Sequence, residues 1–298
     1  MSSSAQRRRA FLQQHVSVFL FGFTAILGKL ISLSGLTLIF WRTLLAVAGF
    51  WLTYGLKQPR PSLPRGREWA PLVGAGAVLM LHWLCFFGAI RLSNASITLV
   101  CLSSATLFTA LLDAALKRSQ PKGYEVLLGV IIMLGIGLIA GVEAGNRWGI
   151  VVGLLSALTS ALYALWNQRL ARKHPAAILN LVEMTSGFGI VALVMVPYLY
   201  FVGTTDFLPR PADWAWLVVL AWLCTNFAYD LSLQAIRHIP IFPFMLAVNL
   251  EPVYGVLMAF AFLGEAQELT TGFWVGSALV LASVFAYPLF QRRFGNLE

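Results

Sequence analysis

Long apolar segments, separated by short polar breaks, run through almost the whole chain. Ten of these segments contain roughly 20 residues each, which is the length a helix needs to cross a hydrocarbon layer. They cover approximately residues 16–34, 36–56, 69–90, 95–116, 124–142, 148–168, 178–203, 213–236, 241–263 and 272–291. The breaks between them are too short to fold as separate domains. The sequence therefore predicts an all-α integral membrane protein with ten transmembrane helices.

Composition agrees with a membrane environment. Hydrophobic residues make up 59% of the chain and charged residues only 11%, whereas a soluble domain carries about 25% charged residues. The net charge of +9 would suggest nucleic acid in a soluble protein. Here, however, the basic residues lie at segment ends, where they meet lipid headgroups. We therefore expect contact with membrane lipid and no nucleic-acid partner.

The basic residues also predict the orientation of the chain. If the N-terminus is cytoplasmic, sixteen basic residues lie at cytoplasmic ends: Arg7, Arg8, Arg9, Lys57, Arg60, Arg65, Arg67, Lys117, Arg118, Lys122, Arg169, Arg172, Lys173, Arg237, Arg292 and Arg293. Only Arg91, Arg147 and Arg210 lie at the opposite ends. This asymmetry follows the positive-inside rule and predicts that both termini are cytoplasmic. The first segment is too long for a cleaved signal peptide, so we expect it to remain as the first span.

The two halves of the chain resemble each other weakly. Ala89-Ile90-Arg91 at the end of the third segment recurs as Ala235-Ile236-Arg237 at the end of the eighth. Each half, 1–146 and 147–298, holds five segments. Because five is odd, the second half would enter the membrane from the opposite face. The pattern predicts an inverted repeat around a central cavity, an arrangement found in many secondary transporters.

A short series of residues in the second half resembles a known family pattern. It consists of Asn249-Leu250-Glu251-Pro252-Val253-Tyr254, then Leu263-Gly264-Glu265, then Gly276. The chain thereby resembles the ten-helix EamA-type branch of the drug/metabolite transporter superfamily. The first half departs from the pattern, with Ala105-Thr106 in place of Glu-Pro and Lys117-Arg118 in place of Gly-Glu.

Among family members the chain is most similar to bacterial exporters of aromatic and other neutral amino acids. The resemblance implies a protein of the bacterial inner membrane with a small-molecule substrate. It also implies a cavity built mainly from spans 1, 3, 4, 6, 8 and 9. We expect the protein to be monomeric.

Polar and aromatic side chains deep within the segments are the candidates for substrate binding. A polar group in a membrane helix is costly unless it faces protein or water. In the sixth segment, Tyr163 and Asn167 share one helical face and Trp166 lies beside it. The predicted substrate-binding residues are His82, Trp83, Ser103, Tyr163, Trp166, Asn167, Asn226, Tyr229 and Asn249. For each of them, a structural role in helix packing is the alternative interpretation.

Charged residues within the segments are candidates for gates or ion pairs. Glu251 lies near the midplane and needs a proton or a cation, which Lys29 or Arg42 could supply. Asp230 lies toward a cytoplasmic end, where Arg169 or Arg237 could neutralise it. Glu183 and Asp113 also lie near cytoplasmic ends, and we expect them to be ion-paired or headgroup-facing. The predicted gating or ion-pair residues are Lys29, Arg42, Asp230 and Glu251.

These residues favour a secondary transporter that exports amino acids with large apolar side chains by alternating access. Two further carrier hypotheses stay open: a carrier for sugar phosphates or nucleotide sugars that uses Lys29 and Arg42, and a proton-coupled drug exporter that uses Glu251. A channel or a membrane-embedded enzyme is less favoured. The sequence carries no HExxH, GxSxG or Walker-type motif. We therefore predict no catalytic residues, no metal site and no cofactor.

Overall fold

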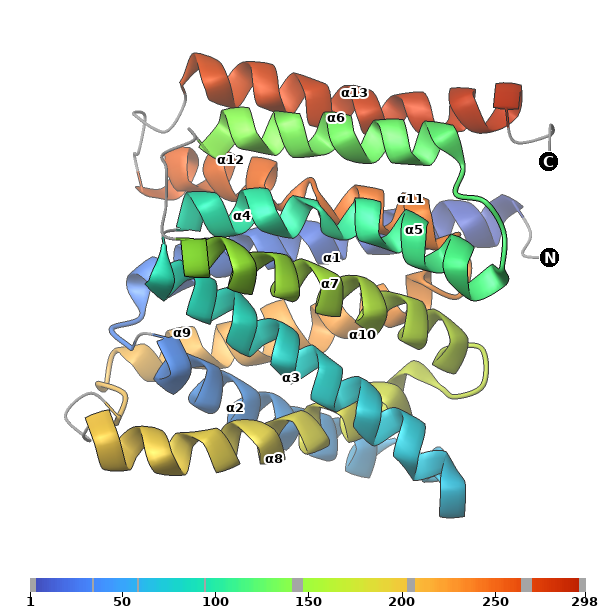
Figure 1. The fold of residues 1–298 in the computed structure, drawn as a ribbon. Helices are drawn as coiled ribbons and strands as arrows, with labels where there is room; N and C mark the ends of the chain where they lie inside the picture. The colour runs from blue at the N-terminus through green and yellow to red at the C-terminus, as the bar shows by residue number, and fades with distance from the viewer. Residues whose placement is uncertain are drawn as a thin grey trace. The chain divides into compact units, whose positions relative to one another are not determined.

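The computed structural model describes residues 4–33, 35–57, 59–93, 95–140, 147–202, 207–263 and 270–294. Within these ranges every regular element is a helix (Figure 1). Nine helical stretches of the described chain are long and apolar enough to cross a membrane, and a further one, Gly123–Ile139, is apolar but shorter. These stretches coincide with the ten predicted segments. The prediction of an all-α membrane protein with ten spans is confirmed.

Seven spans of the described chain each form one continuous α-helix. They are α1 (Ser4–Leu30), α2 (Gly35–Leu56), α3 (Trp69–Leu92, preceded by the 3-10 turn η1, Gly66–Glu68), α6 (Gly123–Ala140), α7 (Arg147–Leu170), α8 (Ala176–Val202) and α13 (Thr271–Phe294). Helix α1 begins well before the predicted start at residue 16, so the basic residues 7–9 are helical too.

The remaining three spans are interrupted. The fourth consists of α4 (Ala95–Ser103) and α5 (Ala105–Lys117), and the ninth of α11 (Ile241–Val248) and α12 (Glu251–Leu263). The eighth consists of α9 (Asp213–Val218), the π-helix η2 (Val219–Phe227) and α10 (Ala228–Ala235). Pro252 lies in the first turn of α12, where the missing N–H of a proline costs least.

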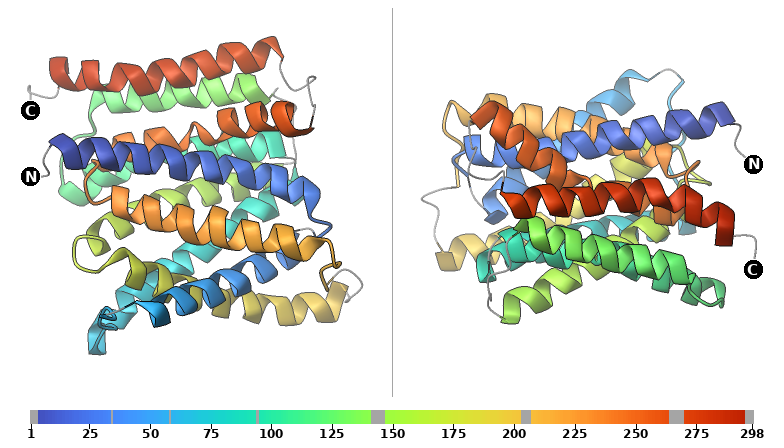
Figure 2. Two further views of the ribbon diagram at one scale, coloured as in Figure 1. Left: turned by 180° about the vertical axis from the view of Figure 1, so that it is seen from behind. Right: turned by 90° about the horizontal axis from the view of Figure 1, so that it is seen from above.

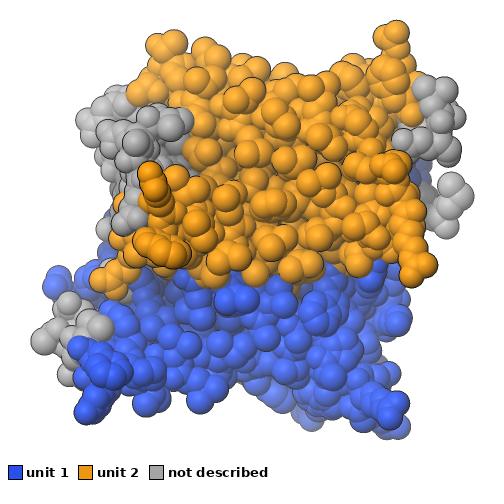
Figure 3. Space-filling view, viewed as in Figure 1, with its two compact units in different colours: residues 1–84, 166–238 blue, residues 85–165, 239–298 orange. Residues whose placement is uncertain are grey.

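The chain forms two compact units, residues 1–84 with 166–238 and residues 85–165 with 239–298 (Figure 3). Each unit takes helices from both halves of the sequence. In the first unit α2 packs against α8 and η2, and α1 packs against η2 and α10. In the second unit α6 packs against α13 and α4, and α5 packs against α11.

Several of these contacts join spans that the proposed inverted repeat makes equivalent, namely spans two and seven, four and nine, and five and ten. They are α2 with α8, α5 with α11, and α6 with α13, the last pair visibly side by side in both views of Figure 2. Contact between equivalent spans supports the repeat, which remains a proposal.

Small residues allow α6 and α13 to approach closely. A Cβ atom added to Gly276 would collide with the backbone oxygen of Gly135, and one added to Gly272 would collide with that of Leu138. In lipid no hydrophobic effect drives two helices together, so close van der Waals packing through small residues must hold such a pair.

A hydrogen-bond network around Asp213 and an apolar core hold together one end of the first unit. The Asp213 carboxylate accepts hydrogen bonds from the Ser32 backbone N–H (2.9 Å), the Ser32 hydroxyl (2.5 Å) and the Arg210 backbone N–H (2.9 Å). Asp213 also begins α9, where a carboxylate is stabilised by the helix dipole. Beneath it lies a core of apolar side chains that includes Leu27, Leu217 and Leu220. This end is the one that the charge pattern predicts to be extracellular.

Candidate functional site

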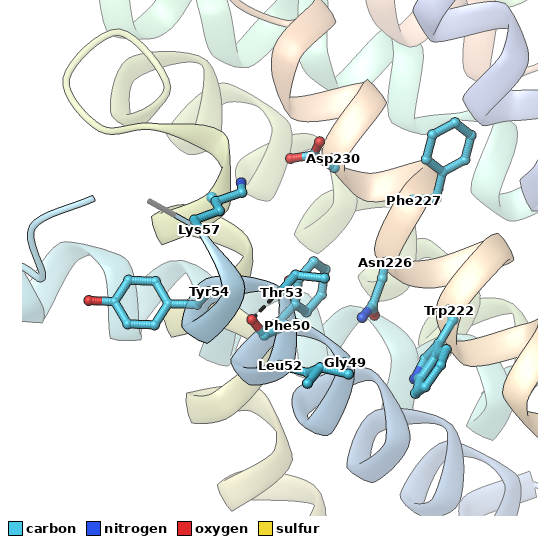
Figure 4. A pocket seen from close by; sticks show the side chains of 11 residues that line it. Gly49, Phe50, Leu52, Thr53, Tyr54, Lys57, Trp222, Asn226, Phe227 and Asp230 are labelled. Carbon is cyan, nitrogen blue, oxygen red and sulfur yellow. Dashed lines mark hydrogen bonds between the residues drawn. The ribbon is translucent and has the colours of Figure 1, made fainter. Parts of the chain in front are cut away.

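A pocket of about 340 Å³ lies in the first unit, beside the C-terminal half of α2 (Figure 4). Its lining combines aromatic rings, two residues of opposite charge and a few polar groups. The lining residues are Gly49, Phe50, Leu52, Thr53, Tyr54, Lys57, Ala177, Trp222, Asn226, Phe227 and Asp230. A concave, largely apolar site with a few polar groups is the usual form of a small-molecule site.

The pocket wall depends on a close approach of η2 to α2. The indole N–H of Trp222 donates to the Leu45 carbonyl (3.1 Å), and the Asn226 amide donates to the Ala46 carbonyl (3.1 Å). Gly49 makes this approach possible, because a Cβ atom there would collide with both Trp222 and Asn226. Two carbonyl oxygens of α2 thus accept hydrogen bonds from side chains of η2.

The π-helix η2 sets the direction of these side chains. In a π-helix the backbone bonds close over five residues rather than four, and this rare geometry occurs frequently at functional sites. Thr225 follows the same wider spacing with its side chain, since its hydroxyl donates to the Leu220 carbonyl (2.9 Å). The same hydroxyl accepts a hydrogen bond from Arg42 Nε (2.8 Å), which links η2 to the middle of α2.

Arg42 also belongs to an aromatic cluster in the first unit. Its guanidinium lies 4.4 Å from the centre of the Trp83 ring, a cation–π distance. The Trp83 ring meets Tyr229 edge-on at 6.2 Å, and Tyr229 meets Phe21 at 5.2 Å. The structure therefore brings together three residues that were predicted separately, Arg42, Trp83 and Tyr229.

Asp230, a predicted gate residue, lines the pocket. Its carboxylate accepts a hydrogen bond from Gln234 (2.7 Å) one turn later in α10. No ion pair within 4.0 Å joins it to Arg169 or Arg237 in the described chain. The Arg237 guanidinium instead donates to the His174 carbonyl. Burial lowers the pKa of Arg237, and the nearby negative charge of Asp230 acts in the opposite direction.

Two predicted binding residues of the second unit, Ser103 and Asn249, lie at the interruptions of spans four and nine. The Asn249 amide donates to the Thr106 hydroxyl (2.5 Å) and to the Met245 carbonyl (3.0 Å). Ser103 donates to the Val100 carbonyl of its own helix (2.7 Å), and both Asn249 and Ser103 are buried. These contacts re-satisfy backbone groups that an interrupted helix leaves open, as a membrane requires.

The other predicted site residues are more scattered. Asn167 is fully buried and donates to the Glu183 carboxylate (3.2 Å), while Trp166 packs over Gly74. His82, Tyr163 and Glu251 are half-buried. The Lys29 side chain lies outside the described part of the chain, and the pairing of Glu251 with Lys29 or Arg42 stays a prediction.

Two expectations about acidic residues had different outcomes. Asp113 is ion-paired with Lys117 (2.6 Å) one turn later, as predicted. The expectation that Glu183 is ion-paired or faces headgroups is wrong about the headgroups, because its side chain is buried within the protein and accepts the Asn167 amide. Its position near a helix end in the sequence did not reveal the helices packed over it.

Sequence reasoning missed most of the pocket lining. From the sequence, Lys57 was placed in the positive-inside pattern alone, and no role was assigned to the aromatic residues of the wall. A signal was present. Gly49 and Thr53 on α2 and Lys57 directly after it follow four-residue spacing, as Trp222, Asn226 and Asp230 do in span eight. Two such stripes give one polar face each, but only the packing shows that the faces meet.

Comparisons with known proteins agree with the fold. The chain is 24% identical over 221 residues to an uncharacterised transporter of Archaeoglobus fulgidus, covering 74% of this chain and 76% of the relative. A second uncharacterised transporter of the same organism is 22% identical over 229 residues, covering 74% and 77%. A crystal structure with 16% sequence identity superposes with a TM-score of 0.79, covering 98% of this chain and 99% of that one.

The family comparison covers both halves of the sequence in turn. The EamA-like transporter family matches residues 11–141 and, a second time, residues 147–287. Together the two matches take in nearly the whole chain and extend into all ten spans. The protein is therefore a multi-pass membrane protein that belongs to the EamA-like transporter family.

Proposed function

We propose that this transporter exports amino acids with large apolar side chains, aromatic ones above all. The observation that carries the proposal is the pocket of the first unit, with the rings of Phe50, Tyr54, Trp222 and Phe227 in its lining. Its volume of about 340 Å³ is in the range of small-molecule sites. Aromatic walls favour a solute that offers a large apolar surface.

The place of the pocket supports export. It lies at the C-terminal end of α2, the end that the charge pattern assigns to the cytoplasm. An exporter must load its solute from that side. The transport cycle that we propose is alternating access, in which the two related halves rearrange and expose the bound solute to either side in turn. A transmembrane gradient supplies the driving force.

The test is transport of labelled amino acids by the purified protein in proteoliposomes, with and without a pH gradient. We expect tryptophan, phenylalanine and leucine to move faster than glycine or alanine, against protein-free liposomes as control. Trp222→Ala should slow aromatic amino acids more than small ones, since it removes part of the pocket wall. Transport of sugar phosphates without transport of any amino acid would contradict the proposal.

Export of cationic drugs is the second candidate, because one lining residue favours it. The Asp230 carboxylate in the pocket wall could attract an amine. The carrier for sugar phosphates has less support, since Arg42 already contacts Thr225 and Trp83. A panel that includes a lipophilic amine and a sugar phosphate beside the amino acids separates the three hypotheses.

A further inference from the structure

The pocket of the first unit contains one positive and one negative side chain that do not pair with each other. Lys57 lies at the end of α2 and Asp230 in α10, and both line the pocket. No ion pair within 4.0 Å joins them in the described chain. Figure 4 shows the Lys57 ammonium and the Asp230 carboxylate extending toward the same open space from opposite sides.

Both charged groups have capacity for a ligand. One oxygen of Asp230 accepts the Gln234 amide, which leaves the other oxygen available. The Lys57 ammonium makes no hydrogen bond to the described residues. Opposite charges that face one cavity at more than contact distance are complementary to a solute that carries both charges.

Asn226 adds an acceptor one turn before Asp230. Its amide nitrogen is engaged by the Ala46 carbonyl, which fixes the orientation of the side chain. Its oxygen is buried and has no hydrogen-bond partner among the described residues. A buried acceptor without a partner costs free energy until a donor reaches it. An ammonium group has three donors and no acceptor, as this site requires.

We propose that Lys57 and Asp230 select the zwitterionic form of the solute. The Asp230 carboxylate and the Asn226 oxygen receive its ammonium group, and Lys57 receives its carboxylate. The apolar side chain then lies along Phe50, Trp222 and Phe227. This assignment rests on the proposed export of amino acids and specifies which residues recognise the backbone charges.

The same arrangement discriminates against the two competing substrate classes. A simple amine would leave the positive charge of Lys57 without a partner, and a simple anion would leave the negative charge of Asp230 without one. Selectivity of this kind comes from repulsion and unpaired groups as much as from attraction. A pocket with only Asp230 would accept amines, and one with only Lys57 would accept anions.

The experiment uses three compounds that share one indole ring: tryptophan, tryptamine, which lacks the carboxylate, and indole-3-propionate, which lacks the amine. Each competes with the labelled amino acid that the wild-type protein transports best in proteoliposomes. We expect tryptophan to inhibit at a concentration about tenfold lower than either analogue, because it alone can form charge-assisted hydrogen bonds with both side chains. Asp230→Asn should remove the preference over indole-3-propionate, and Lys57→Gln should remove the preference over tryptamine.

Matched controls separate selectivity from folding. Lys57→Arg and Asp230→Glu keep the charges and should keep the preference for tryptophan. Lys173→Gln and Asp113→Asn remove charges from residues outside the pocket lining and should change nothing in the competition. If Asp230→Asn and Lys57→Gln retain wild-type selectivity, the assignment is overturned while amino-acid export stands. If the wild-type protein moves no amino acid, both proposals fall.

Discussion

A single missing side chain, that of Gly49, decides how closely η2 can lie against α2. A Cβ atom at this position would collide with the Asn226 amide and with the Trp222 ring. Both of these side chains donate to carbonyl oxygens of α2 and form part of the pocket wall. Gly55, six residues later on the same helix, has no neighbour within 4 Å of its Cβ position.

Gly49→Ala should therefore lower both stability and transport, whereas Gly55→Ala should not. The first substitution forces the helices apart and weakens two hydrogen bonds, at a cost of about 1–3 kcal/mol. The second replaces a helical glycine in open space and should stabilise by roughly 0.5–1 kcal/mol. Melting temperature in detergent and transport rate in proteoliposomes measure the difference. Equal melting temperatures of the two variants would show that the contact is unimportant.

Residue type alone predicted two residues of the pocket lining, Asn226 and Asp230, and three residues of the aromatic cluster around Arg42. Arg42, Trp83, Asn226, Tyr229 and Asp230 were predicted because polar or aromatic groups inside a span must find protein or water. In the structure all of them lie in one unit. Asn249 and Ser103 were predicted for the same reason, but their side chains bond to Thr106 or to carbonyls of interrupted helices. The residue type predicts that a partner exists and does not say whether the partner is a solute or the backbone.

At the scale of elements, the π-helix in span eight is the feature with the clearest consequence. The Thr225 hydroxyl follows the wider spacing of this helix, because it donates to the Leu220 carbonyl five residues earlier. It also accepts a hydrogen bond from Arg42 Nε. Because η2 carries Trp222 and Asn226 and leads into Asp230, a change in its winding would rotate the pocket lining. No sequence pattern predicted this element, since its residues form a largely apolar run like that of the other spans.

Thr225→Val tests this role, since valine keeps the shape of threonine but removes the hydroxyl. We expect a loss of about 1–3 kcal/mol, because the Leu220 carbonyl and Arg42 each lose a buried partner. The transport rate should fall as well, because the pocket wall shifts. Thr225→Ser keeps the hydroxyl and serves as the control. A valine variant with wild-type melting temperature and transport would contradict the role of this hydroxyl.

Of the interruptions in spans four and nine, only the one in span nine has a signal in the sequence. In span nine, Pro252 is a sequence signal for a break. The structure has one helix ending at Val248 and a new one beginning at Glu251. Span four breaks at Ser104 without any proline or glycine. There the Ser104 hydroxyl donates to the Cys101 carbonyl (2.6 Å), a local bond that competes with the regular helix. Such competition depends on the packing around it and carries no sequence marker.

At the scale of the whole molecule, the charge pattern makes a prediction that single cysteines can check. Ser119, between α5 and α6, belongs to a predicted cytoplasmic break, and Leu208, before α9, belongs to a predicted extracellular one; both are exposed. After replacement of Cys85, Cys101 and Cys224, Leu208→Cys should react with a membrane-impermeant maleimide in intact cells. Ser119→Cys should react only after permeabilisation. The reverse pattern would invert the topology and place the pocket on the extracellular side.

The sequence by itself determined the solvent, the number of spans and the family. These properties follow from the length and apolarity of each segment and from short motifs. None of them depends on which helices are in contact. The tertiary structure alone decided that helices from both halves of the chain combine in each compact unit. It also brought Lys57 and Asp230, far apart in sequence, to one pocket. In lipid every span is apolar on most faces, so apolarity cannot specify which faces are in contact. Close contacts at glycines, the π-helix η2 and a few buried hydrogen bonds specify them instead.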